Sequence, residues 1–454
     1  MTEIVGDTAA DPARAHSALR WGVLGLAALA IFSSYYESDA IGTIADLLGR
    51  QRGFTQSQIG DLTAVISLPS ILIAVVCGRL IDRFGAARIS LWAAIIGLAG
   101  AVLTAIGEPY DLMWSGRLLF GVSEGTIFIA LLKVLAEWFP RSGIALASAV
   151  FLSLARVGSY SLDKSPIWAR PLYSNWQSPL WLGAGITAAG LLAAVLLRLL
   201  DAWHPLSTAA ADGSAGAAGA ALVRTVQRPR FEWRSVARFD RSFWYILGLH
   251  VLYAAVFFPF RQTYAIEYLQ HAKGLSLQQA GNVNSGVFAA AVFATPLFGL
   301  LADRFGHRAL LLVIGSLLLP VTFVVLGLTE LSPWVSTVLM GVSFAMVPAI
   351  IWPSTTLIVE PKRLGIALGL ITQVQALALW GSNRLAGLLA DAAHAGPAHP
   401  QGYSVMLVWF GAVSLTALTS ALLLWRRERG PQAHGLELAR PRPSQAPRAS
   451  LGGS

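Results

Sequence analysis

The sequence has very little cysteine, lysine or charge of either sign. Cys77 is the single cysteine among 454 residues, so an intramolecular disulfide is excluded. Lysine occurs only four times. Charged residues form 13% of the chain, against about 25% in ordinary soluble proteins, and hydrophobic residues form 55%. This composition excludes a string of ordinary soluble domains and indicates a membrane protein.

Sequence signatures of catalysis are also missing. We find no glycine-rich phosphate loop, no metal-spaced cluster of cysteine and histidine, and no credible nucleophile elbow. The stretch Gly121–Gly125 contains a serine between glycines, but it lies inside an apolar helical run. We therefore predict that the protein is not an enzyme and binds no metal or other cofactor.

Long apolar stretches are what the chain does contain. Each covers about 20 residues, enough to cross ~30 Å of hydrocarbon as a helix, and none alternates as barrel strands do. The sequence predicts an all-α membrane protein of twelve transmembrane helices, six on each side of a central segment. The predicted spans are 20–47, 57–80, 88–107, 112–138, 143–167, 177–200, 242–268, 277–301, 308–328, 333–358, 364–389 and 401–425.

Five segments follow from this pattern: 1–19, a first bundle at 20–200, a linker at 201–240, a second bundle at 241–426, and a tail at 427–454. The first apolar run continues well past the length of a signal peptide, so we expect a retained first span. The linker is rich in alanine and glycine and then basic. Its arginines can bind anionic lipid headgroups, although a plain excess of positive charge on the cytoplasmic side is the simpler interpretation.

Arginine and lysine gather in one set of loops, which the positive-inside rule places in the cytoplasm. This set includes the linker, the tail and the loops after the second and eighth spans. Both termini are therefore predicted to be cytoplasmic, in a cell inner membrane. The net charge of +9 then follows from topology rather than from nucleic-acid binding. The proline-rich tail after Arg429 is predicted to be disordered.

One sequence motif occurs twice in the chain. Gly78–Gly85 recurs as Gly299–Gly306, 221 residues later, with Asp-Arg-Phe-Gly at the end of each copy. The spans that lead to these loops open with the capping boxes Thr55–Gln58 and Ser276–Gln279. A repeated Gly-x-x-x-Asp-Arg-x-Gly loop in a six-plus-six chain resembles the major facilitator superfamily. The resemblance implies two six-helix bundles that rock about a central site, giving alternating access.

The two halves differ in their intramembrane charges. Charges within spans are costly and usually functional. Six of them have uncharged counterparts in the second half: Glu37, Asp39, Arg117, Glu124, Lys133 and Arg156 correspond to Phe258, Phe260, Thr337, Phe344, Pro353 and Ala378. The fold does not need these six charges for its geometry, so we interpret them as site or coupling residues.

Glu124 and Arg156 lie at similar depth on consecutive spans. They either form a structural ion pair or hold the two charged ends of a zwitterion. The stretches Gly116–Glu124 and Leu152–Ser159 resemble the branch of major facilitator superfamily domain-containing protein 1, a lysosomal dipeptide uniporter. That resemblance implies that Glu124 and Arg156 contact the termini of a peptide.

Further cargo residues are predicted from position and resemblance. They are Arg117, Lys133, Gln375, Tyr253 and Trp352, although aromatic residues in spans more often serve packing. Five intramembrane basic residues, including Arg261 and Arg384, face three acidic ones, which favours an anionic cargo or an acidic peptide. Alternatively, Lys133 and Arg384 reach the membrane surface.

Gating and coupling residues are predicted in two places. Glu37, Asp39 and Arg261 occupy the outer halves of the first and seventh spans, where they are expected to pair when the outer side is closed; either acid is also a candidate proton carrier. The motif loops supply Asp82, Arg83, Asp303 and Arg304.

The sequence thus predicts a monomeric carrier in a lipid bilayer that moves a small polar organic solute, with dipeptide-like, zwitterionic and anionic compounds foremost and protons as a candidate coupling ion. The alternatives are an organic-anion exporter or antiporter and, in a different class, a transporter-like sensor or assembly subunit without flux.

Overall fold

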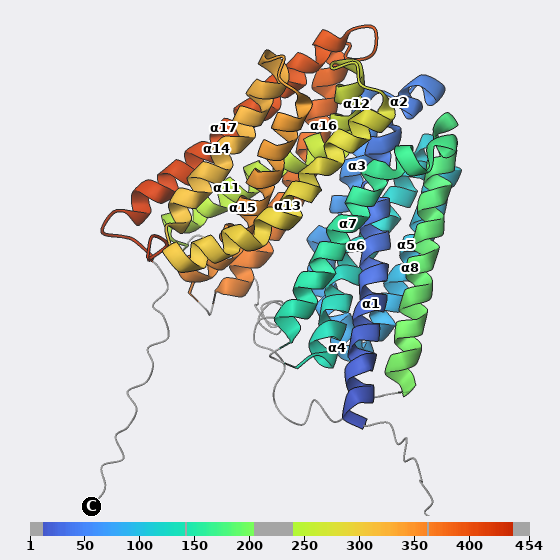
Figure 1. Cartoon of the computed structure of the whole chain (residues 1–454), viewed down its shortest axis with the longest axis vertical. Coiled ribbons are helices and arrows are strands. Elements are labelled where there is room, and N and C mark those ends of the chain that lie inside the picture. The colour runs from blue at the N-terminus through green and yellow to red at the C-terminus, as the bar shows by residue number, and fades with distance from the viewer. Residues whose placement is uncertain (1–11, 141–142, 204–238, 361–362, 439–454) are drawn as a thin grey trace, which may run out of the picture.

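The computed structural model describes residues 12–140, 143–203, 239–360 and 363–438, and these are almost entirely helical (Figure 1). The first half comprises α1 (Pro12–Ser38), α2 (Ala40–Arg52), α3 (Gln56–Ala64), η1 (Val65–Ser67), α4 (Ser70–Phe84), α5 (Ala86–Ile106), α6 (Tyr110–Trp138), α7 (Ile144–Trp168), η2 (Arg170–Ser174) and α8 (Gln177–Trp203).

The second half repeats this order. It comprises α11 (Arg241–Pro259), the π-helical turn η4 (Phe260–Tyr264), α12 (Ala265–His271), α13 (Leu277–Phe305), α14 (Arg308–Leu328), α15 (Pro333–Ile358), α16 (Leu364–Ala392), η5 (Pro400–Gly402) and α17 (Tyr403–Glu428). Most of the predicted linker lies outside the described residues.

Ten helical stretches among the described residues are long and apolar enough to cross a membrane. Neither 57–80 nor 143–167 is among the ten, so the count of twelve spans stays a prediction. The first of these is divided into α3, η1 and α4 by a short turn, whereas the second is one helix, α7.

The predicted helix starts have a local cause. The side chains of Thr55 and Ser276 each accept a hydrogen bond from the backbone N–H three residues on. The side-chain oxygen of the glutamine at that position accepts one from the backbone N–H of the cap residue, so both capping boxes are confirmed. The motif helices end at Gly85 and Gly306, whose φ angles of 86° and 70° suit glycine. The repeated phrase therefore builds the same helix–turn–helix join in each half.

The two halves touch through equivalent helices. The second predicted span of each half packs on the fifth predicted span of the other: α3 lies against α16, and α13 lies against α7. In addition, α2 packs on α12 and η4. Figure 1 shows the bundles meeting at the end that carries α2 and α12 and diverging toward the end that carries α4 and the first turns of α1. We call these the converging and diverging ends.

Glycines permit the close contacts between the halves, as Gly60 and Gly281 illustrate. A Cβ atom added to Gly60 would lie 2.8 Å from the carbonyl oxygen of Asn383, and one added to Gly281 would lie 2.2 Å from that of Asp163. Gly60 and Gly281 are themselves related by the 221-residue repeat. Backbone therefore packs directly on backbone at both joins, which no larger residue would allow.

The chain after Arg429 is ordered as far as residue 438, so the prediction of a disordered tail is wrong for this part. Residues 430–438, here called the C-terminal strap, fold back on the diverging end. Leu436 is fully buried, and its carbonyl accepts from the N–H of Arg308 at 2.9 Å. Glu437 accepts from the N–H of Leu310 at 3.1 Å, where it caps α14. The amino-acid composition did not reveal the strap, because its contacts with the helices rest on one buried leucine and one capping carboxylate.

Deleting the strap is expected to destabilise the protein. A chain ending at Arg429 loses the burial of Leu436 and the cap on α14, which together stabilise by about 2 kcal/mol. Its thermal unfolding temperature, measured in detergent, should fall. A chain ending at Leu438 keeps the strap and is the matched control. Equal unfolding temperatures for the two truncations would contradict this assignment.

Candidate functional site

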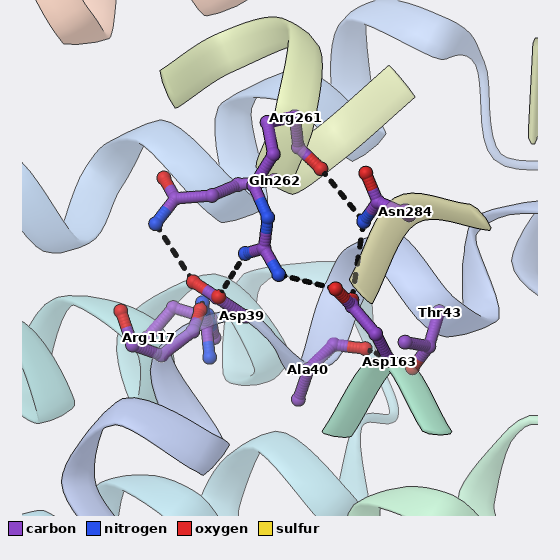
Figure 2. A network of polar contacts seen from close by, with 9 residues as sticks. Asp39, Ala40, Thr43, Arg117, Asp163, Arg261, Gln262 and Asn284 are labelled. Carbon is purple, nitrogen blue, oxygen red and sulfur yellow. Dashed lines mark hydrogen bonds and ion pairs between the residues drawn. The ribbon is translucent and has the colours of Figure 1, made fainter. Parts of the chain in front are cut away.

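The halves are joined at the converging end by a buried ion network. Arg261, in η4, pairs through separate guanidinium nitrogens with Asp39 of the first half and Asp163 of α7 (Figure 2). The Gln262 amide donates to Asp39 at 2.7 Å, and the Asn284 amide donates to Asp163 at 3.1 Å. The network thus brings the predicted Asp39 and Arg261 together and adds Asp163, which the sequence analysis did not name.

The predicted cargo residue Arg117 is bound to backbone carbonyls. Its side chain is fully buried and donates to the backbone carbonyls of Glu37, Ser38 and Leu62 at 2.9, 2.5 and 3.1 Å. The first two carbonyls lie where α1 ends, just before Asp39. Arg117 therefore stabilises the break between α1 and α2 and sets the position from which Asp39 reaches Arg261.

Glu37 is buried beside this break. One carboxylate oxygen lies 3.8 Å from a guanidinium nitrogen of Arg117, but neither oxygen has a hydrogen-bond partner among the described residues. A Cβ atom on Gly183 would lie 2.2 Å from that carboxylate, so α8 leaves it room only because the residue there is glycine. Glu37 and Asp39 thus differ: Asp39 has a full set of partners and Glu37 does not.

Polar contacts flank the network at both glycine joins. Asp61 lies 3.4 Å from Arg384 and accepts from the indole of Trp380 at 3.2 Å. At the repeat-related join, Lys164 donates to Asn282. Asp61 and Asn282 are 221 residues apart, and Lys164 and Arg384 are 220 apart. The two contacts are therefore related by the repeat. Aligning the fifth span with the eleventh would have predicted them from the sequence.

The charge count from sequence changes accordingly. Asp61, Asp163 and Lys164 belong with the intramembrane charges, and Arg384 and Arg261 each face a carboxylate. Lys133 lies 3.8 Å from Glu137, one helical turn away. The positive surplus inferred from sequence is therefore absent once these neighbours are included.

Glu124 and Arg156 are the exceptions. Both side chains are half-buried, and no ion pair within 4 Å is formed by either with the residues that the structure describes. Glu124 is hydrogen-bonded to Ser38, and the charges of Arg117 and Arg156 attract it at longer range. Arg156 instead lies among three rings, with its guanidinium carbon 5.4 Å from the centroid of Tyr35, 5.4 Å from Phe288 and 4.9 Å from Phe344. These distances are typical of cation–π contacts. We call these three rings the aromatic box.

The predicted cargo residues of the second half form a separate polar cluster. The ring nitrogen Nε2 of His250 lies 2.9 Å from the Gln375 amide oxygen, and the His250 ring meets Trp352 edge-on at 5.2 Å. Tyr253 is buried and its hydroxyl lies 2.9 Å from that of Ser343. Gln375 and Trp352 keep partial exposure, whereas Tyr253 contributes mainly to packing.

The motif loops lie at the diverging end, away from the ion network. Asp82, Arg83 and Arg304 are exposed there. The guanidinium carbons of Arg83 and Arg304 lie 5.1 and 5.6 Å from the ring centroids of the neighbouring phenylalanines. The side chain of Asp303 is outside the described set, so its predicted gating role is untested.

Replacing Arg117 with methionine should destabilise the fold. Three buried carbonyls would lose their donor, at a cost on the order of 3 kcal/mol, and thermal unfolding in detergent reports it. Arg384→Met is the control, because that side chain is 51% exposed and should change stability by less than about 1 kcal/mol. An Arg117→Met protein as stable as the control would show that the α1–α2 break needs no such donor.

Comparison with known proteins agrees with this architecture. The chain is 27% identical over 432 residues to the lysosomal dipeptide transporter MFSD1 of Bos taurus, covering 91% of this chain and 86% of the relative. It is 24% identical over 287 residues to the probable sulfoacetate transporter SauU of Cupriavidus necator, covering 63% and 65%.

Solved structures share the fold. A mutant of the nucleoside transporter NupG superposes with a TM-score of 0.72 at 11% identity, covering 89% of this chain and 99% of that one. A bacterial homologue of the human lysosomal transporter Spinster, in an inward-facing and occupied conformation, gives 0.68 at 17% identity, covering 92% and 98%. The Major Facilitator Superfamily profile matches residues 27–379 and 262–450. The chain is therefore a multi-pass membrane protein that belongs to the Major Facilitator Superfamily.

Proposed function

We propose that the protein carries a small zwitterionic solute, with dipeptides as the leading class, across a cell inner membrane by alternating access. The observation that carries this proposal is the pair of unmatched charges, Glu124 and Arg156. Most other intramembrane charges have an ionic partner among the described residues, as Arg261, Asp163 and Arg384 do. A charge held half-buried without an opposite charge beside it is costly unless a ligand supplies one.

The two unmatched charges are of opposite sign. A cargo with one amino and one carboxyl group would satisfy both, because Glu124 can accept from an ammonium and Arg156 can donate two parallel bonds to a carboxylate. The aromatic box keeps Arg156 in place without neutralising it. Relatives named as dipeptide transporters support this choice of cargo.

An organic-anion carrier is the second candidate. It is favoured by Arg156 alone, and by a relative named as a probable sulfoacetate transporter. The residues themselves argue against it, because Glu124 would then face an anion with no cation to offset it. We therefore rank it below the zwitterion.

The structure corresponds to the state of a carrier that is closed at the converging end and open at the diverging end. With both termini in the cytoplasm, the converging end faces outward and is held closed by Arg261, while the diverging end faces inward. We propose that opening the outer side separates Asp39 and Asp163 from Arg261, and that the monomer completes this cycle alone.

Binding should require both charges. Purified protein is expected to unfold at a higher temperature in the presence of a neutral dipeptide, since a ligand at 100 times its dissociation constant stabilises by about 2.7 kcal/mol. Glu124→Gln and Arg156→Ala should each abolish most of this shift. Lys133→Met is the control, because Lys133 already faces Glu137.

Blocked peptides separate the two candidate functions. A dipeptide with an acetylated amino terminus should stabilise the parent much less than the free dipeptide does, whereas Glu124→Gln should respond to the two peptides alike. A simple organic anion that stabilises the parent more than any dipeptide does would favour the second candidate. If neither class stabilises the parent, the carrier proposal gives way to a sensor or assembly subunit.

Proton coupling is expected to depend on Glu37 rather than Asp39. Glu37 is buried with no hydrogen-bond partner on its carboxylate among the described residues, whereas the carboxylate oxygens of Asp39 have partners in Arg261 and Gln262. In proteoliposomes, Glu37→Gln should remove any stimulation of uptake by a pH gradient. Asp39→Asn should slow uptake with and without the gradient. Gradient dependence that survives in Glu37→Gln would exclude Glu37 as the proton carrier.

A further inference from the structure

One ring lies between the proposed cargo site and the outer ion network. The centroid of Phe288, on α13, is 4.0 Å from the guanidinium carbon of Arg261 and 5.4 Å from that of Arg156. The side chain of Phe288 is almost fully buried. Both distances fall within the ~6 Å over which a cation is attracted to an aromatic face. Phe288 thus contacts one cation of each site.

The other two rings of the aromatic box lack this double contact. Tyr35 and Phe344 lie near Arg156, and neither stacks on Arg261 among the described residues. Phe344 also packs on Phe257 at 4.2 Å, which ties it to the core of the second half. Among the cation–ring contacts of the described residues, Phe288 is therefore the ring that reaches both arginines.

Two cations on one ring oppose each other. Both are attracted to the negative charge of a single ring, and their like charges repel in a medium of low dielectric constant. Asp39 and Asp163 compensate the charge of Arg261, whereas the charge of Arg156 has no carboxylate paired with it among the described residues. A cargo carboxylate would neutralise Arg156 and draw it from the ring, which leaves the ring to Arg261.

We propose that Phe288 couples occupancy of Arg156 to closure of the outer ion network. When a cargo carboxylate is bound to Arg156, the contacts of Arg261 with Phe288 and with its two aspartates become stronger. The outer side therefore stays closed while cargo is bound. Release toward the diverging end restores the competition and makes outer opening easier for the empty carrier. By reciprocity, closure of the outer network raises affinity for the carboxylate. This inference rests on Arg156 being the cargo ligand, and Phe288 is a positioning residue that acts through two arginines.

The test needs no cargo, because Arg156→Gln mimics the neutralised site. Gln56, at the start of α3, is 8% exposed, and its side-chain amide donates to Glu267 of the second half at 2.7 Å, so we expect it to become reachable when the converging end opens. In full-length Cys77→Ser protein in nanodiscs, the rate at which a membrane-impermeant maleimide modifies Gln56→Cys reports the open population. Arg156→Gln should slow this modification several-fold. In a Phe288→Leu background, Arg156→Gln should leave the rate unchanged.

Two controls make the result specific to Phe288. Tyr35→Leu removes a ring that contacts Arg156 and that, among the described residues, stacks on neither Arg261 nor Phe288, so the response to Arg156→Gln should persist. Phe323→Leu removes a buried ring that packs on Phe260 and Phe410, so it measures the loss of ring packing alone. An equal response to Arg156→Gln with and without the Phe288 ring would overturn the coupling. The thermal-shift experiment with dipeptides tests the cargo assignment separately.

Discussion

The attraction between Arg261 and two aspartates is the interaction on which the contact between the halves at the converging end depends. It joins the halves across their seam, and it does so with charges removed from water. A buried cation that loses one carboxylate is poorly solvated, so the network resists partial opening and favours two discrete states. The neighbouring glutamine and asparagine amides complete the hydrogen bonding of the aspartates, which makes the closed arrangement specific as well as strong.

Three intramembrane arginines differ in the groups that surround them. Arg117 donates to backbone carbonyls and serves the geometry of α1 and α2. Arg261 is bound to carboxylates and serves the contact between halves. Arg156 is held by rings, which position a cation without cancelling its charge. Three arginines that look alike in sequence thus have different functions, because their partners are carbonyls, carboxylates and aromatic faces respectively.

The sequence predicted a helical chain of two related halves, the capping boxes at Thr55 and Ser276, and the meeting of Asp39 with Arg261, since all three follow from local chemistry or from the repeat. The carbonyl partners of Arg117 could not be predicted, because they appear only when a helix breaks beside it. Asp163 was missed because its role depends on α7 packing against α13, a contact that no local pattern encodes. The ordered strap was missed for a related reason, since Leu436 is an isolated apolar residue in a polar segment.

The close approaches at Gly60 and Gly281 are not isolated. An added Cβ atom on Gly42 of α2 would lie 2.0 Å from the carbonyl oxygen of Gln262, and one on Gly387 of α16 would lie 2.6 Å from that of Gln56. The two halves therefore meet backbone to backbone at several places near the converging end. Contacts of this kind leave no side chain to adjust, so a movement between the halves would have to release them together, as a rigid-body change does. The contact between the bundles is thus made by the absence of side chains.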